Sequence, residues 1–107
     1  MSSNDTLQRL EAVIASRRGG DPEASYVARL NDRGVEKIAQ KLGEEAVEAV
    51  IAALGEDRDA LVCEAADLVF HLLVLLDRKA IALAEVLSEL DRREGTSGIA
   101  EKASRKN

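Results

Sequence analysis

The fold of this chain is decided by residues 60–78, which read ALVCEAADLVFHLLVLLDR. Nearly all of these residues are aliphatic, so a helix wound from them is apolar around most of its circumference. Glu64, Asp67 and His71 are spaced three and four residues apart, which places them on one narrow stripe of that helix. Neighbouring acids on a mostly buried helix normally pair, shift their pKa values or bind a metal, because they repel each other and lose hydration. We expect His71 either to hydrogen-bond a ligand carboxylate or to pack as a satisfied histidine.

Helices on either side of this stretch give an all-α fold. Apolar residues recur at helical spacing over residues 35–54, and residues 55–57 form a tight turn that makes the two long helices antiparallel neighbours. The alanine-rich, aliphatic composition, with 2% aromatic residues, favours this class over an all-β fold. We expect a helical bundle of four to five helices. The other predicted helices are residues 6–18, capped by Asp5 and ended by Gly19 and Gly20; residues 21–30, broken by residues 31–34; and residues 83–93.

Composition and charge narrow the possible functions. A chain of 107 residues has the size of one domain, which we expect over residues 1–95, followed by a polar, basic tail over 96–107. The net charge of −5 argues against a nucleic-acid partner, since phosphate contacts need a basic face. Without a charged-then-apolar leader or an apolar run near about 18 residues, we expect a cytoplasmic protein with no membrane contact. We interpret the single cysteine, Cys63, as a small core residue in a reducing compartment.

The chain carries more apolar surface than a small bundle can cover. The helix over residues 60–78 is apolar on most sides, and the helix over residues 35–54 has a second apolar ridge at Val47, Ile51 and Leu54. Apolar surface left over after intramolecular packing usually marks an interface with a partner. We therefore expect a homodimer or a larger helical assembly.

Four acids on the two long helices are positioned to meet, and a fifth, Glu44, lies beside them in the sequence. Glu44 and Glu45 lie one turn before Glu48, and Glu64 and Asp67 repeat the three-residue spacing on the next helix. If the two helices pack antiparallel, Glu45 and Glu48 face Glu64 and Asp67, and these four carboxylates cannot all stay charged without a cation. Ligand sets made only of oxygen suit Mg²⁺ or Mn²⁺ rather than Zn²⁺. The pattern predicts hydrolysis or transfer at a polyphosphate.

The alternative for such helices is a solvated face laced with salt bridges, and it fits poorly here. Lys41 precedes Glu45 in the less favourable orientation for an ion pair, and the pairs that Glu48 forms with its neighbouring glutamates are repulsive. Lys37 and Lys41 share a stripe with Glu44 and Glu48, so both lysines are either contacts for substrate phosphates or ordinary surface cations.

The acidic motif and three other segments resemble a known enzyme family. The motif is similar to that of the all-α, MazG-like nucleoside triphosphate pyrophosphohydrolases, and the whole chain resembles the phosphoribosyl-ATP pyrophosphohydrolases within that superfamily. The acidic motif alone is moderately specific, and the other segments make the narrower resemblance much stronger. The segments that carry it are residues 25–30 (SYVARL), 37–48 (KIAQKLGEEAVE), 66–73 (ADLVFHLL) and 97–105 (SGIAEKASR).

The resemblance implies hydrolysis of phosphoribosyl-ATP to phosphoribosyl-AMP and pyrophosphate, the second step of histidine biosynthesis, in a helical dimer with the site near its interface. It implies Mg²⁺ held by Glu45, Glu48, Glu64 and Asp67, with Glu44 behind these ligands or orienting the attacking water. Candidate contacts for the substrate phosphates and the ribose phosphate are Arg29, Lys37, Lys41, Lys102 and Arg105.

Two other functions fit parts of the pattern. A housekeeping pyrophosphohydrolase of the same superfamily would keep the metal site and act on ordinary or damaged nucleoside triphosphates. A non-enzymatic helical dimerisation module would leave the acids facing water. In that module, Mg²⁺ would not stabilise the fold and neutralising Glu64 or Asp67 would do no harm.

Overall fold

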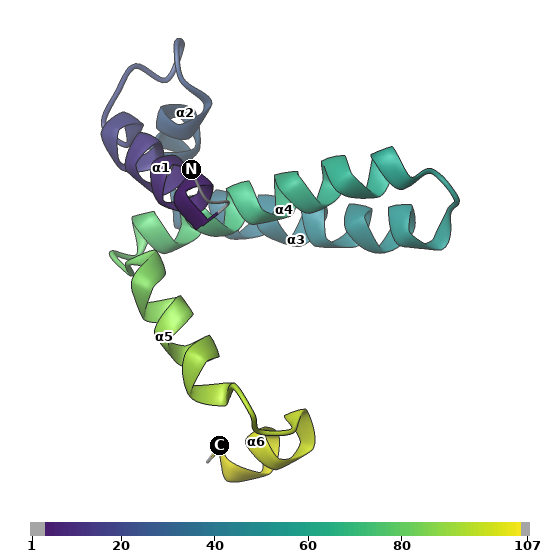
Figure 1. Cartoon of the computed structure of the whole chain (residues 1–107). Helices are drawn as coiled ribbons and strands as arrows, with labels where there is room; N and C mark the ends of the chain where they lie inside the picture. Colours follow the sequence, from purple (N-terminus) through teal and green to yellow (C-terminus); the bar gives the residue numbers. More distant parts are fainter. Residues whose placement is uncertain (1–3, 106–107) are drawn as a thin grey trace.

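The computed structural model describes residues 4–105, and in that range the chain is all-α, which confirms the predicted fold class (Figure 1). None of the helices in this range has the length and hydrophobicity that a membrane span needs. In chain order the helices are α1 (Asn4–Arg17), α2 (Tyr26–Arg33), α3 (Val35–Leu54), α4 (Arg58–Arg78), α5 (Leu83–Arg93) and α6 (Gly98–Ser104).

The centre of the fold is the antiparallel hairpin of α3 and α4. Helices α1 and α2 pack against one end of this hairpin, and α5 leaves that same end in a different direction (Figure 1). The buried residues of the hydrophobic core come from α1, α2, α5 and the end of the hairpin that they surround. The core therefore lies at this end of the hairpin and not along its whole length. Its buried residues are Ile14, Val27, Leu30, Ile38, Leu73, Val74 and Leu83.

Helix ends follow local capping, and this explains where the predictions succeeded or failed. The bounds predicted for α3 and α5 are confirmed, and α4 begins two residues early because Asp57 accepts a hydrogen bond from the Ala60 backbone N–H at 3.1 Å. Asp5 is not the cap of α1, since the helix already includes it; an acid in the first turn is instead favourable to the helix dipole.

The start predicted for α2 at residue 21 is wrong. Residues 21–24 form a turn, and the helix begins at Tyr26 because the Ser25 side chain caps the Ala28 N–H at 3.2 Å. Gly34 ends α2 and begins α3 with φ +97° and ψ 170°, a conformation that is essentially confined to glycine. The two helices can therefore change direction without a longer linker.

The segment after Gly95 contains a seven-residue helix, α6, that was not predicted from the sequence. Its Glu101 is buried, and Arg92 on α5 donates to both carboxylate oxygens at 2.6 and 3.0 Å. This ion pair ties α6 to α5, so the two helices form an arm apart from the α3–α4 hairpin (Figure 1).

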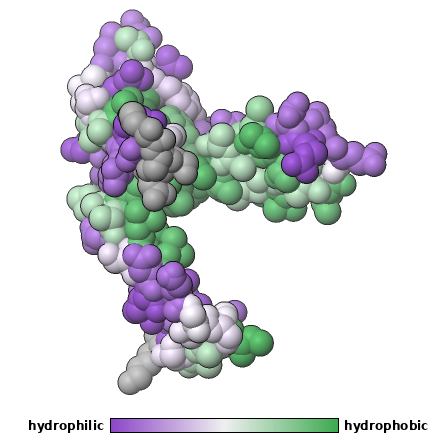
Figure 2. Space-filling view, in the orientation of Figure 1, coloured by the Kyte–Doolittle hydropathy of each residue, from purple (hydrophilic) through white to green (hydrophobic). Residues whose placement is uncertain are grey.

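Much apolar surface remains exposed on the far part of the hairpin. The ridge predicted at Val47, Ile51 and Leu54 is exposed, with 58%, 64% and 85% of each residue accessible. Hydrophobic residues are visible along this part of the molecule in Figure 2. Cys63 is exposed as well, so the prediction of a core cysteine is wrong: it lies on α4 two turns before His71, where the buried residues of that helix begin.

Candidate metal and substrate site

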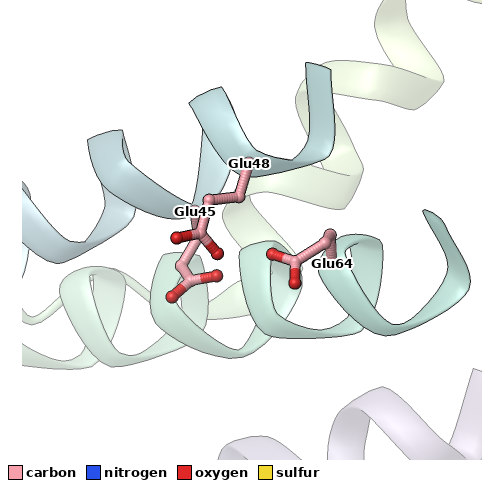
Figure 3. A group of neighbouring side chains, drawn as sticks. All are labelled: Glu45, Glu48 and Glu64. Atoms are coloured by element: carbon pink, nitrogen blue, oxygen red, sulfur yellow. The ribbon is translucent and has the colours of Figure 1, made fainter. Parts of the chain in front are cut away.

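Three glutamates from the two long helices converge in the groove of the hairpin. Glu45 and Glu48 come from successive turns of α3, and Glu64 faces them from α4 (Figure 3). One carboxylate oxygen from each lies within 4.8 Å of the others. The antiparallel hairpin therefore brings together acids that are sixteen or more residues apart in sequence.

These carboxylates fit a hard cation. Glu45 is buried, with 9% of the residue exposed, and the Oε2 atoms of Glu45 and Glu64 are buried with no hydrogen-bond partner among the described residues. A buried, unpartnered carboxylate oxygen is costly, because nothing replaces the water it has lost. An oxygen-binding cation would supply the missing partner, and Mg²⁺ and Mn²⁺ prefer such ligands.

The electrostatics of the groove lead to the same interpretation. Hydrogen bonding with Glu48 raises the pKa of Glu64 to about 7. Loss of hydration and the negative charges of Glu48, Glu45 and Asp67 act in the same direction. Without a cation the cluster therefore holds a proton that isolated glutamates would release well below neutral pH.

The two other predicted acids lie at the edge of this group. Asp67 is exposed one turn after Glu64, near enough for its charge to act on that carboxyl group, but it is not one of the three converging residues. Glu44 is exposed and accepts hydrogen bonds from Gln40 at 2.8 Å and Lys41 at 3.1 Å. These two contacts lower the pKa of Glu44, so it stays ionised.

Both ring nitrogens of His71 have hydrogen-bond partners, and neither partner is one of the converging glutamates. Its Nδ1 lies 2.7 Å from the Asp67 carbonyl oxygen, which can only accept, so Nδ1 donates. In the neutral ring, Nε2 then accepts from the Tyr26 hydroxyl at 2.9 Å. The Tyr26 ring also stacks on Phe70 at a centroid distance of 6.0 Å. His71 therefore positions Tyr26, as the packing interpretation expects.

Three of the five predicted substrate cations lie together. Arg29 on α2 and Lys37 and Lys41 on α3 line one cavity of about 190 Å³. Lys102 and Arg105 lie at the end of the α5–α6 arm, away from the hairpin of the same chain (Figure 1).

Sequence reasoning missed the two other polar residues of this cavity, Tyr26 and Arg33. The signal was available, because Tyr26, Arg29 and Arg33 follow one another at the three- and four-residue spacings of one helix face.

Comparison with known proteins identifies the family. The family model described as phosphoribosyl-ATP pyrophosphohydrolase matches residues 7–94. A phosphoribosyl-ATP pyrophosphatase from Novosphingobium aromaticivorans is 67% identical over 107 residues, all of both chains. Proteins of the same name from Erythrobacter litoralis and Rhizorhabdus wittichii are 62% and 63% identical, over 94% of this chain and 97% and 94% of their own. The chain therefore belongs to the phosphoribosyl-ATP pyrophosphohydrolase family, a family of hydrolases.

Proposed function

We propose that this protein hydrolyses phosphoribosyl-ATP to phosphoribosyl-AMP and pyrophosphate, the second step of histidine biosynthesis, in the cytoplasm. The observation that carries the proposal is the convergence of Glu45, Glu48 and Glu64, with buried unpartnered oxygens, in a member of this family. Water adds across the bond between the α- and β-phosphates, so the products are a nucleoside monophosphate and pyrophosphate.

We propose that the carboxylates of the hairpin bind Mg²⁺. Glu45, Glu48 and Glu64 are its proposed ligands, and Asp67 completes the set from the exposed edge of the groove. When bound, Mg²⁺ would neutralise the charge that develops on the departing pyrophosphate. Glu44 stays ionised and lies beside the cluster, so its carboxylate can accept a hydrogen bond from the attacking water and orient it.

The cations on α2 and α3 are assigned to the substrate phosphates. Lys41 lies one turn before Glu45 and carries its charge beside the glutamates, where it can contact the triphosphate. Arg29 and Lys37 line the cavity next to it. A site made of both carboxylates and cations can hold a metal and the anionic substrate at the same time.

We also propose that the protein is a homodimer that buries the exposed part of the α3–α4 hairpin. Val47, Ile51, Leu54 and Val62 are each more than half exposed, and a second copy with the same apolar surface can cover them. This interface lies beside the glutamates, since Val47, Glu48 and Ile51 line one shallow hollow of α3.

Lys102 and Arg105 are proposed to act only across this dimer, because α6 lies away from the hairpin of its own chain (Figure 1). Truncation after Gly95 removes both cations. We expect it chiefly to raise KM for phosphoribosyl-ATP, and an unchanged KM would remove these two residues from the site.

The experiment measures pyrophosphate release from phosphoribosyl-ATP by Glu48→Gln and Asp67→Asn. We expect each variant to lose activity and keep its helical circular dichroism, because each substitution removes a ligand charge without changing side-chain shape. Glu56→Gln, in the turn at the far end of the hairpin, is the matched control and should stay active. Activity retained in both site variants would contradict the metal assignment.

A further inference from the structure

A cavity between α2 and α3 gathers four cationic side chains around one tyrosine. Its volume is about 190 Å³. The residues that line it are Tyr26, Arg29, Leu30, Arg33, Lys37 and Lys41. Among the residues that the structure describes, no acidic side chain lines this cavity, so its walls combine positive charge, one aromatic ring and one aliphatic contact.

Local sequence spacing explains why the cations meet. Arg29 and Arg33 are four residues apart on α2, and Lys37 and Lys41 are four residues apart on α3, so each pair lies on one helix face. Gly34 is the only residue between the two helices. Its positive φ turns the chain sharply enough for the two basic faces to line the same space.

Most of this positive charge has no counter-ion within residues 4–105. Arg29 donates from Nε to the Pro22 carbonyl at 3.0 Å and forms no ion pair in that range, and the same part of the chain places no carboxylate within 4.0 Å of Arg33 or Lys37. Lys41 alone is paired, with Glu44 at 3.1 Å. Like charges gathered without a partner repel each other, and an anion in the cavity would relieve that repulsion.

The cavity begins beside the glutamates at Lys41 and extends away from them along α3. At a rise of about 1.5 Å per residue, the eight residues from Lys37 to Glu45 span about 12 Å of α3. Lys41 therefore lies at the end of the cavity nearer the glutamates, and Lys37 lies one turn farther from them. Phosphoribosyl-ATP carries a further phosphate on its second ribose, on the opposite side of the adenine from the triphosphate.

The cavity offers a contact for the adenine as well as for a phosphate. Tyr26 presents an aromatic ring in the cavity wall, and it is held in place by Phe70 and His71. An aromatic ring beside a nucleotide site can stack on the base. The glutamates can then hold the triphosphate through a metal, and Tyr26 can stack on the adenine. Arg33 and Lys37 can hold the second ribose phosphate.

We propose that this cavity binds the phosphate of the phosphoribosyl group, with Arg33 and Lys37 as specificity-determining residues that distinguish phosphoribosyl-ATP from ATP. The inference rests on the proposed function for its ligand. Arg33 supplies a planar fork of donors for the phosphate oxygens, and Lys37 adds a second positive charge from the facing helix.

The test measures binding without catalysis. The full-length protein is titrated in EDTA with phosphoribosyl-AMP and, separately, with AMP, and the ratio of the two Kd values is compared between wild type, Arg33→Gln and Lys37→Gln. We expect the wild type to bind phosphoribosyl-AMP at least about tenfold more tightly than AMP, and each variant to lose most of that ratio with little change for AMP. Arg58→Gln, an exposed arginine at the start of α4, is the charge-matched control and should keep the wild-type ratio.

The outcomes separate this inference from the proposed function. A wild-type ratio near one, an unchanged ratio in both variants, or an equal loss of affinity for both ligands would each overturn the cavity assignment. Pyrophosphate release from phosphoribosyl-ATP is measured on the same wild-type preparation. Its absence beside a normal binding ratio would overturn the proposed function and leave the cavity assignment standing.

Discussion

Glu64 is the residue whose chemistry depends most on what occupies the groove. In the metal-free protein its pKa is raised to about 7 by hydrogen bonding with Glu48, by loss of hydration and by the neighbouring negative charges. The ordinary value is 4.5, so the folded protein holds this proton more tightly than the unfolded chain does. The contribution to stability is complete below pH 4.5 and is lost as the pH rises through about 7.

The first prediction compares the pH dependence of stability in two proteins. In EDTA, we expect the Tm of the wild type to fall relative to that of Glu64→Gln as the pH rises from about 5 to about 7.5, because the variant has no proton to lose there. Thermal unfolding followed by circular dichroism at several pH values measures the difference. Glu56→Gln should track the wild type throughout. A Tm difference between wild type and Glu64→Gln that does not change with pH would refute the assignment of this proton.

At the scale of the element, the turn after α4 holds one alanine in an unfavourable backbone conformation, and a single substitution can remove this strain. Ala80 has φ +59°, in the left-handed region that favours glycine. The turn needs this conformation, because the Ile81 N–H bonds to the Leu76 carbonyl at 2.9 Å and the Ala80 N–H bonds to the Asp77 carbonyl at 3.0 Å. These are the two hydrogen bonds of a Schellman motif.

The second prediction is that Ala80→Gly stabilises the protein by about 1 kcal/mol, since glycine adopts this conformation without the steric cost of a Cβ. Urea unfolding of wild type and variant measures the change. Ala84→Gly, inside α5, is the matched control and should instead destabilise by roughly 0.5–1 kcal/mol. A loss of stability in both variants would mean that the turn after α4 does not hold the left-handed conformation.

The helices also show how far the sequence predicts this structure. Helices α3 and α5 were predicted with their observed bounds because apolar periodicity and local boundary residues agree there. Helix α6 was missed because the buried ion pair between Glu101 and Arg92 connects it to another helix, and no periodic pattern records such a contact. The start of α2 was misplaced because residues 21 and 22 resemble a helix start, while the Ser25 cap decides it.

The sequence likewise predicted one part of the candidate site and missed another. Spacing along α3 and α4 predicted the convergence of Glu45, Glu48 and Glu64, because the turn at residues 55–57 fixes how the helices pair. The cavity of cations was predicted only in part. Arg33 joins it through the sharp turn at Gly34, and the direction of that turn depends on a backbone angle that composition does not reveal.

At the scale of the whole molecule, the hairpin and the α5–α6 arm leave the core in different directions (Figure 1). The core lies where α1, α2 and α5 meet the hairpin, so the far part of α3 and α4 has only its partner helix to pack against. In the isolated subunit the ridge at Val47, Ile51 and Leu54 is exposed to water. A second copy that covers this ridge would add hydrophobic stabilisation.

The third prediction concerns this assembly. The wild type should sediment as a dimer, and Ile51→Glu should weaken association by at least about 2 kcal/mol, because it places an unpaired charge in an apolar interface. Sedimentation equilibrium over a range of concentrations measures the change. Val13→Glu, a partly exposed position on α1, is the control for the added charge. A monomeric wild type, or an equal loss of association in both variants, would place the interface elsewhere.

The most direct test of the central claim is pyrophosphate release from phosphoribosyl-ATP, measured with and without Mg²⁺ beside a panel of plain nucleoside triphosphates. We predict release that requires Mg²⁺ and is confined to phosphoribosyl-ATP, because we propose that the glutamates bind the metal and that the cavity of α2 and α3 binds the second ribose phosphate. Mg²⁺-dependent release from the plain triphosphates instead would contradict the substrate assignment. Release from phosphoribosyl-ATP that persists in EDTA would contradict the role of the carboxylates.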